Sequence, residues 1–314
     1  MRKRKKSSDS GNYRDILQKQ GYQMVGFGGA VKTCLWLRKS LKDEGVCYKE
    51  KFYGIKSHCC IQMTPAFDCN QRCLHCWRPV EFNALDDCTP YDEPRVLVDG
   101  SIAAQRRLLT GYKGFEKVNA NKLTEAFNPR HVAISLNGEP TLYPFLNELI
   151  EEFKKGGLTT FVVSNGTQPD ILKVIHPTQL YVSLNAPDED HYYRICRPIS
   201  GSFSNFKKSL HVLSEHESRT VVRVTLANGI NRFDPNNYAN LIEMAEPDYV
   251  EVKSYMHLGF SRKRLPRSTM VEHGDVVAFA SDLADALGYV IADESKISRV
   301  VLLSKSKASR KIAI

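Results

Sequence analysis

Three closely spaced cysteines are the residues of this sequence best suited to chemistry. Cys69, Cys73 and Cys76 form a C-x3-C-x2-C motif. Thiolates hold iron–sulfur clusters, and three thiolates on a four-iron cluster leave one iron open for a further ligand. The alternative is a zinc site with His75 or Cys88 as the fourth ligand. Either interpretation predicts a metal centre at this motif.

A second set of cysteines precedes the first. Cys34, Cys47 and Cys60 are separated by twelve residues each. Clustered cysteines in a cytosolic chain favour metal binding or catalysis over disulfides. Because Cys60 falls in the strand that leads to the first motif, we expect both sets to reach one cavity, where a three-cysteine cluster would be able to bind a second substrate. The other cysteines match no motif and are interpreted as packing residues or free thiols: Cys59, Cys88 and Cys196.

Alternating strands and helices must position these residues. From residue 58 onward the sequence alternates short apolar runs with amphipathic segments, which predicts βαβ units and a parallel sheet. Six strands are too few for a closed eight-stranded barrel, so we expect an open sheet curved into part of a barrel. The expected strands are 59–64, 131–136, 159–164, 180–184, 219–226 and 249–253, and the expected helices include 142–155, 203–214 and 237–245.

Polar turns follow the ends of four of these strands, at 137–141, 164–166, 185–188 and 228–229. Each turn alone is an ordinary loop signal. The carboxyl ends of parallel strands meet at one edge of a sheet, where α/β proteins carry their ligand sites. We therefore expect a ligand site at this edge.

The positive charge of the chain is concentrated at its N-terminus. Residues 1–57 contain fourteen Lys and Arg against five Asp and Glu, whereas the rest of the chain contains thirty of each. A basic segment that is rich in aromatic residues suits a polyanion such as nucleic acid, and a solubilising tail at Met1–Lys6 is the alternative. No apolar stretch is long enough for a membrane span, so we expect a cytoplasmic protein.

The first cysteine motif and the turn at Gly138 resemble the radical S-adenosylmethionine (SAM) superfamily. The resemblance implies that Cys69, Cys73 and Cys76 hold a 4Fe-4S cluster whose open iron takes the amino and carboxylate groups of SAM. An electron from that cluster would cleave SAM to a 5′-deoxyadenosyl radical. It also implies an α/β fold, a partial (βα)6 radical SAM barrel with an N-terminal extension.

Further SAM contacts follow from the same resemblance. Gly138, Glu139, Pro140 and Thr141 are similar to the superfamily's GGEP motif, which meets the amino group of SAM, although Asn137 replaces the first glycine. Asn165 and Ser183 are placed to bond the ribose or carboxylate of SAM, with turn capping as the alternative. His75 stands where an aromatic residue is usual, and its flat ring can still stack on adenine.

Within that superfamily the chain resembles the archaeal tRNA 4-demethylwyosine synthases. The similarity runs from about residue 21 onward and includes 53–58, 69–78, 131–135, 138–144, 160–166 and 253–257. It implies a lyase-type enzyme that joins N1-methylguanosine-37 of tRNA-Phe with carbons from pyruvate to form 4-demethylwyosine. It further implies a second 4Fe-4S cluster on Cys34, Cys47 and Cys60, and Lys49 as the residue that forms a Schiff base with pyruvate. A phosphate-contacting surface lysine is the alternative for Lys49.

The family resemblance also assigns the last strand and the segment after it to the tRNA path. The residues concerned are Lys253, Tyr255, His257, Arg262 and Arg264. We expect three segments: a basic extension with second-cluster cysteines at 1–57, the partial barrel at 58–265, and a C-terminal extension at 266–314. A separate electron donor and a monomer are expected as well.

Two other functions stay open. A radical SAM enzyme could act on another RNA or protein substrate, although the second cysteine set with Lys49 argues against an activase. A zinc-dependent RNA-binding module would be colourless, whereas iron–sulfur clusters colour a protein brown.

Overall fold

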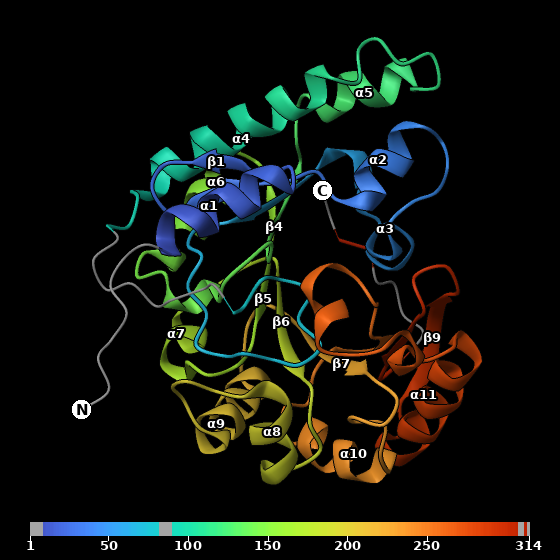
Figure 1. Ribbon diagram of the computed structural model, residues 1–314. Helices are drawn as coiled ribbons and strands as arrows, with labels where there is room; N and C mark the ends of the chain where they lie inside the picture. Colours follow the sequence, from blue (N-terminus) through green and yellow to red (C-terminus); the bar gives the residue numbers. More distant parts are fainter. Residues whose placement is uncertain (1–8, 82–89, 307–310, 313–314) are drawn as a thin grey trace.

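One open sheet of ten strands organises the protein (Figure 1). The computed structural model describes residues 9–81, 90–306 and 311–312. The strand order is β1-β2-β3-β4-β5-β6-β7-β8-β10-β9, and the first and last strands do not pair. The sheet is therefore a partial barrel, as the sequence predicts. None of the described helices is both long enough and apolar enough to cross a membrane.

The centre of the sheet is six parallel strands in chain order. They are β3 (Cys60–Thr64), β4 (His131–Ile134), β5 (Thr159–Ser164), β6 (Gln179–Leu184), β7 (Arg219–Leu226) and β8 (Tyr249–Ser254). All six strand predictions are confirmed to within two residues. Such runs are readable because strands covered on both faces are rich in Val, Ile and Leu.

Antiparallel strands that the sequence analysis did not predict extend both edges of this centre. On one side β1 (Gln23–Val25) and β2 (Gly29–Val31) form a hairpin that pairs with β3. On the other side β10 (Val300–Ser304) pairs with β8 and with β9 (Val290–Ser295). Both terminal regions are thus built into the same sheet as the barrel.

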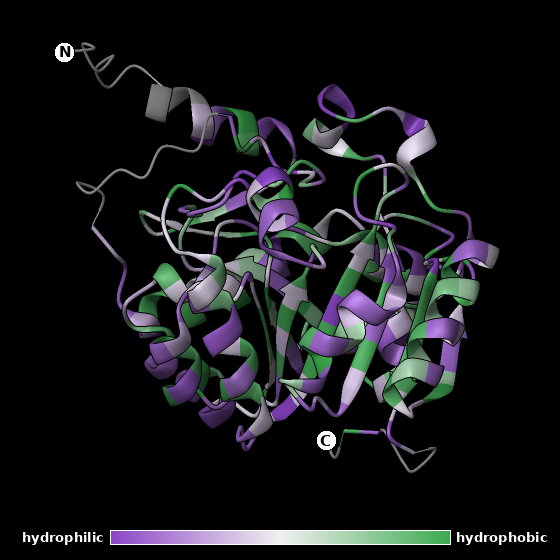
Figure 2. Ribbon diagram, turned by 90° about the horizontal axis from the view of Figure 1, so that it is seen from below, coloured by the Kyte–Doolittle hydropathy of each residue, from purple (hydrophilic) through white to green (hydrophobic). Residues whose placement is uncertain are grey.

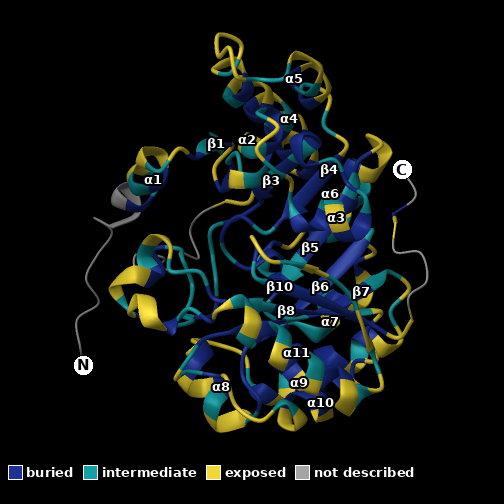
Figure 3. Ribbon diagram, turned by 90° about the vertical axis from the view of Figure 1, so that its right-hand side faces the viewer, coloured by how far each residue is buried: buried dark blue, intermediate teal, exposed yellow. Residues whose placement is uncertain are grey.

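Helices cover the outer face of the sheet (Figures 1 and 2). The main hydrophobic core lies between them and the strands, with the strand interiors buried and the outward helix faces exposed (Figure 3). The helices are α1 (Asp9–Lys19), α2 (Leu35–Leu41), α3 (Tyr48–Tyr53), α4 (Pro94–Thr110), α5 (Ala120–Ala126), α6 (Leu146–Lys155), α7 (Pro169–Val174), α8 (Glu189–Cys196), α9 (Phe203–Ser214), α10 (Pro235–Glu243) and α11 (His273–Leu287), with short 3-10 turns η1 (Ser57–Cys59), η2 (Pro140–Leu142), η3 (Gly259–Lys263) and η4 (Arg267–Thr269).

Two of the three predicted helices differ from the observed ones. The helix expected at 142–155 is split into η2 and α6, because Pro144 forces Tyr143 into extended backbone. The helix expected at 237–245 begins earlier, at Pro235, where Asp234 caps its first turn. The third, α9, matches 203–214.

A smaller apolar cluster fills the inner, concave face of the sheet near the amino ends of the strands. It packs Phe52 and Tyr53 of α3 against Phe161 of β5 and Tyr181 of β6. The N-terminal extension therefore plugs this end of the partial barrel, and the space above the plug stays open at the carboxyl ends.

Candidate active site

A cavity of about 550 Å³ opens at the carboxyl ends of the parallel strands. Its lining combines the first cysteine motif with the predicted turns after β4, β5 and β6 and with the segment that follows β8. The fourth predicted turn, 228–229 after β7, is not among the lining residues. The predicted residues that line it are Cys69, Cys73, Cys76, Gly138, Glu139, Asn165, Ser183, Lys253 and Tyr255. Strand order alone brings these distant segments to one place.

The three motif cysteines lie on residues 65–78, which we name the cluster loop. The loop pairs with the end of α8: the amides of Arg72 and Leu74 donate to the carbonyls of Cys196 and Ile195, each at 3.0 Å. Burial raises the pKa of the Cys69 thiol to about 12, and Nη1 of Arg78 lies 3.8 Å from Sγ of Cys76. Three half-buried cysteines beside a cation suit a bound metal centre, which supplies the positive charge that thiolates need.

The turn after β4 touches the cluster loop closely. Gly138 has a φ of +63°, and a Cβ there would lie 2.5 Å from the carbonyl oxygen of Ala66. Only glycine therefore fits this contact. Pro140 and Thr141 form the start of η2, both buried. Asn137, which replaces the first glycine of the motif, donates from Nδ2 to the Tyr13 hydroxyl at 2.7 Å and so ties α1 to the turn.

Glu139 joins the turns after β4 and β5. Its Oε1 accepts from the hydroxyls of Thr141 and Ser164, both at 2.8 Å, and from the Thr141 amide at 3.2 Å. Its Oε2 accepts from the Asn165 amide at 2.7 Å. Burial raises the pKa of Glu139, while these donors oppose the shift. The carboxylate is thus largely occupied by the protein and sets the position of Asn165.

Three buried polar atoms in the cavity wall lack partners among the described residues. They are Nδ1 of His75, Oδ1 of Asn185 and Oγ of Ser298. Burial, assisted by Arg264 and Arg78, lowers the pKa of His75 to about 4, so its ring is neutral. Unpartnered polar atoms beside Ser183 and Asn165 fit a polar nucleoside such as SAM.

The second set of cysteines gathers around Lys49. Neither these cysteines nor Lys49 is among the residues that line the cavity, so the expectation that both sets reach one cavity is not confirmed. Burial raises the pKa of Cys47 to about 11, and the neighbouring Cys34 thiol raises it further. Burial, then Cys34 and to a smaller extent Cys47, raise the pKa of Cys60. Lys49 is 9% exposed, and its Nζ lies 4.5 Å from the ring centroid of Phe161. Burial and then Arg223 lower the pKa of Lys49, which favours the neutral amine.

The comparisons with known proteins point in one direction. Residues 63–242 match the model of the radical SAM superfamily, and residues 244–305 match that of wyosine base formation. The SAM-dependent tRNA 4-demethylwyosine synthase of Pyrococcus horikoshii is 47% identical over 300 residues, covering 93% of this chain and 88% of the relative. That of Methanocaldococcus jannaschii is 43% identical and covers 95% of this chain and 96% of the relative.

A solved structure of a related protein is similar along nearly the whole chain. The structure of TYW1 with a lysine-pyruvate adduct bound has a TM-score of 0.87 and 42% identity, covering 96% of this chain and 97% of that chain. The chain belongs to the tRNA 4-demethylwyosine synthase family. As a radical SAM enzyme of this family it uses SAM and a 4Fe-4S cluster, which excludes the alternative of a zinc-dependent RNA-binding module.

In this synthase fold, a buried ionic network lies on the inner face of β7 and β8. Glu251 accepts from Nε and Nη2 of Arg223, each at 2.9 Å, and from the Tyr53 hydroxyl at 2.9 Å. The Tyr48 hydroxyl also donates to Glu251, at 3.2 Å. Lys253 lies above this network and donates from Nζ to the Ser298 carbonyl at 3.1 Å. Burial and Arg223 lower the pKa of Lys253 to about 8.

The residues expected on the tRNA path of the synthase separate into two groups. Tyr255 is buried and donates to Ser261, and His257 is hydrogen-bonded to the Leu265 carbonyl. Arg264 is also largely buried; it donates to the carbonyls of Leu74 and Cys76 in the cluster loop and pairs with Glu81. Of this set, Arg262 is exposed.

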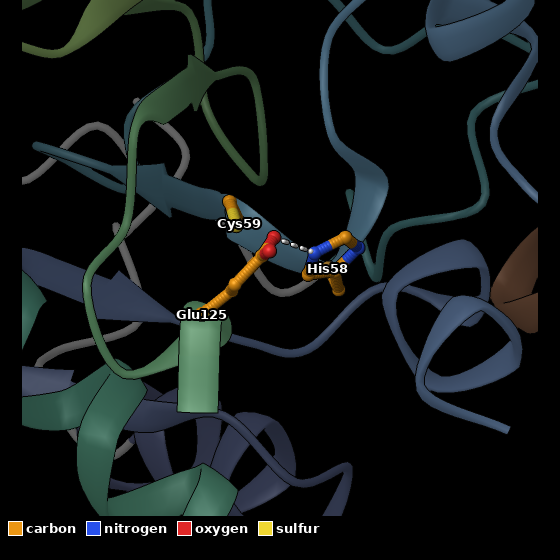
Figure 4. A group of neighbouring side chains, drawn as sticks. All are labelled: His58, Cys59 and Glu125. Carbon is orange, nitrogen blue, oxygen red and sulfur yellow. Dashed lines mark hydrogen bonds and ion pairs between the residues drawn. The ribbon is translucent and has the colours of Figure 1, made fainter. Parts of the chain in front are cut away.

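One possible metal-ligand group lies outside the cavity. His58, Cys59 and Glu125 place one ligand atom each within 4.8 Å of one another (Figure 4). Glu125 already accepts from His58 at 2.9 Å and from Lys56 at 2.7 Å, and these bonds lower its pKa to about 2. Because the Lys56 ammonium occupies the carboxylate, the group anchors η1, which precedes Cys60, to α5.

Several site residues were missed from the sequence. Arg223 and Glu251 are charged residues at inward positions of apolar strands, and that departure from pattern was the available signal. Arg78 follows the motif directly. Ser298 carries no sequence signal at all. Cys196, interpreted as a packing residue, is buried beside Cys73, while Cys88 and Met1–Lys6 fall outside the described residues.

Proposed function

We propose that this protein is a SAM-dependent tRNA 4-demethylwyosine synthase that joins N1-methylguanosine-37 of tRNA-Phe with two carbons of pyruvate. The observation that carries the proposal is the position of Lys49. It is a buried lysine among Cys34, Cys47 and Cys60, close to Arg223, which lines the cavity that holds the first cysteine motif. A lysine-pyruvate adduct in a structure 42% identical to this one supports the same role.

Cys69, Cys73 and Cys76 would hold the first cluster, and the turns after β4, β5 and β6 would hold SAM. When bound, this pair supplies a 5′-deoxyadenosyl radical after reductive cleavage of SAM. Gly138 and Glu139 keep the cavity wall against the cluster loop, and His75 offers a neutral ring to the adenine. Ser183 and Asn165 offer hydrogen bonds to the ribose or carboxylate.

Cys34, Cys47 and Cys60 would hold a second 4Fe-4S cluster. The three cysteines are half-buried and lie close enough to raise one another's pKa, so they suit a metal centre better than three separate thiols would. Lys49 would attack the carbonyl carbon of pyruvate as a neutral amine and release water to form a Schiff base. Its burial between Phe161 and Tyr181 supports this protonation state.

The methylated guanine would enter through the mouth of the cavity. Leu35, Trp36 and Lys39 of α2 lie there, and Nζ of Lys39 is 5.5 Å from the Trp36 ring centroid. An aromatic ring beside a cation is suited to a splayed-out base and its phosphate. Arg262 would contact the tRNA backbone nearby. A cytoplasmic location, a monomeric state and a separate electron donor stay predictions.

The first experiment is iron and sulfide analysis of the anaerobic protein beside a variant with Cys34, Cys47 and Cys60 all changed to Ala. We expect the wild type to be brown and to hold about twice the iron of the variant. The wild type should then convert methylguanosine-containing tRNA to 4-demethylwyosine with SAM, pyruvate and a reductant.

Equal iron in both proteins would remove the second cluster from the proposal. Product formation without added pyruvate, or from another RNA or protein in place of this tRNA, would favour the alternative of a radical SAM enzyme with a different substrate.

A further inference from the structure

An excess of positive charge lies at the cavity wall, where the half-buried Arg223 and Lys253 approach the buried Lys49. Lys49, Arg223 and Lys253 face one another from α3, β7 and β8, and each of the two lysines has its pKa lowered in part by Arg223. Among the described residues, these three cations make a single ion pair, the one between Arg223 and Glu251. Buried charges without partners are costly, so this site is suited to an anion that comes from outside.

The guanidinium of Arg223 is fixed along one edge, and the described residues leave its Nη1 free to bind a ligand. Its Nε and Nη2 bond Glu251, and Nη2 is also 2.9 Å from the Tyr48 hydroxyl. Its Nη1 has no hydrogen-bond partner in the described part of the chain, and the residue lines the cavity. A guanidinium fixed by a carboxylate on one edge is ready to bind an anion on the other.

Ser298 provides an independent sign of a ligand. It is 4% exposed, lines the cavity, and its Oγ finds no partner among the residues described. Its carbonyl accepts from Lys253 at 3.1 Å, so the unused hydroxyl lies next to the lysine. The turn between β9 and β10 brings it there, because β10 pairs directly with β8.

The distance to Lys49 suits a very small substrate. Nζ of Lys49 and Cζ of Arg223 lie 4.6 and 4.5 Å from the ring centroid of the same residue, Tyr181. In a 2-oxo acid the carboxylate is bonded directly to the carbonyl carbon that a lysine attacks. The two distances place Nζ of Lys49 within about 9 Å of Cζ of Arg223. A three-carbon acid whose carboxylate is bound at Arg223 can therefore direct its carbonyl carbon toward the amine.

We propose that Arg223, Lys253 and Ser298 bind the carboxylate of the 2-oxo acid and present its carbonyl carbon to Lys49. The inference rests on the proposed function, in which pyruvate forms a Schiff base with Lys49. It moves Lys253 from the tRNA path, where the family resemblance places it, to the pyruvate site. Lys253 and Arg223 then act as substrate-binding residues that leave the imine chemistry to Lys49.

The test is a pyruvate titration of the full-length, cluster-loaded protein without SAM or tRNA. Cyanoborohydride reduces the Schiff base to a stable secondary amine, which mass spectrometry measures on the Lys49 peptide. The variants are Lys253→Met and Ser298→Ala, and the control is Lys51→Met, which removes an exposed lysine two residues from Lys49. Methyl pyruvate, which lacks the carboxylate charge, is titrated in parallel, and iron content is measured for every protein.

We expect Lys253→Met to raise the half-saturating pyruvate concentration about ten-fold or more and Ser298→Ala to raise it about three-fold. The half-saturating pyruvate concentration of the control should match that of the wild type. With methyl pyruvate, the half-saturating concentrations of all the proteins should be similar. Ser298→Ala removes an unpartnered hydroxyl and is not expected to disturb folding, so it keeps the test valid if Lys253→Met is unstable.

Wild-type pyruvate curves in both variants would overturn the inference. An equal loss with pyruvate and methyl pyruvate would also do so, because the variants would then act on Lys49 rather than on a carboxylate. Lower iron in Lys253→Met with an unchanged Ser298→Ala curve would assign the cation to the cluster instead. If the wild type forms no adduct at all, the pyruvate step of the proposed function fails, and the inference fails with it.

Discussion

Replacing Glu139 by Gln tests whether this carboxylate holds the SAM side of the cavity together. Each of its oxygens accepts from a backbone amide, Oε1 from Thr141 at 3.2 Å and Oε2 from Asn165 at 2.7 Å. A backbone amide can only donate. Whichever way a Gln side chain is turned, its NH2 group therefore faces an amide that it cannot bond.

The free-energy cost of Glu139→Gln follows from the two hydrogen bonds to backbone amides. One charge-assisted hydrogen bond is lost and one buried amide is left without a partner, which together cost about 2 kcal/mol after the relief of removing a buried charge. If Asn165 stays in place, the free energy of unfolding falls by that amount. If Asn165 moves, the same energy appears as a roughly thirty-fold weaker affinity for SAM.

Both quantities can be measured on the same sample. Equilibrium dialysis of anaerobic, cluster-loaded protein gives the SAM affinity, and denaturant unfolding gives the stability. Glu148→Gln, the same change at an exposed position of α6, should alter neither. Wild-type SAM affinity together with wild-type stability in Glu139→Gln would refute this account of the turn.

Three further changes test other contacts of the site. Gly138→Ala should destabilise the protein by about 2–4 kcal/mol and lower its iron content, because the new Cβ would meet two backbone oxygens of the cluster loop at 2.5 and 2.6 Å. The control is Gly157→Ala, which is also at positive φ but has open space around it. It should lower the stability by about 1 kcal/mol and leave the iron content unchanged. Burial lowers the pKa of His131 to about 4, below the value near 6.5 of an unfolded chain, so the unfolded state takes up the proton first as pH falls. Stability should drop by about 2 kcal/mol between pH 7 and 5, and denaturant unfolding of His131→Asn should show a smaller drop; an equal drop would contradict the assignment. Arg264→Lys should lower iron retention because it loses hydrogen bonds to the cluster loop. Arg262→Ala should keep its iron and reduce the salt dependence of tRNA binding by about one phosphate contact. Iron analysis and filter binding measure the two effects. If Arg262→Ala loses iron and Arg264→Lys weakens tRNA binding instead, the two assignments are wrong.

Much of the barrel and of the first metal motif was readable from local patterns. A buried parallel strand is a short apolar run, and a run ends at a turn whose residues can be recognised without knowing the fold. The six central strands and the turns after them were predicted for this reason. Where a local rule was overlooked, as with Pro144 before α6, the helix boundary was wrong.

The roles of individual charged residues were harder to predict. The family resemblance placed Lys253 and Arg264 on the tRNA path. In the structure both are half-buried and bonded to the protein: Lys253 to Ser298 and Arg264 to the cluster loop. Sequence shows that a residue is charged, but only burial and partners show whether the charge meets solvent, a ligand or the protein itself.

The sequence by itself determined the radical SAM assignment and predicted the residues for SAM cleavage, because three thiols at fixed spacing and a Gly-Glu-Pro turn are local features. It also placed Lys49 between two second-set cysteines. Only the tertiary structure decided what surrounds that lysine. Tyr48 and Glu251 are 203 residues apart in the chain, and Ser298 reaches Lys253 only because β10 pairs with β8. Such contacts depend on strand order and register, which arise from packing of the whole sheet, and no local pattern encodes them.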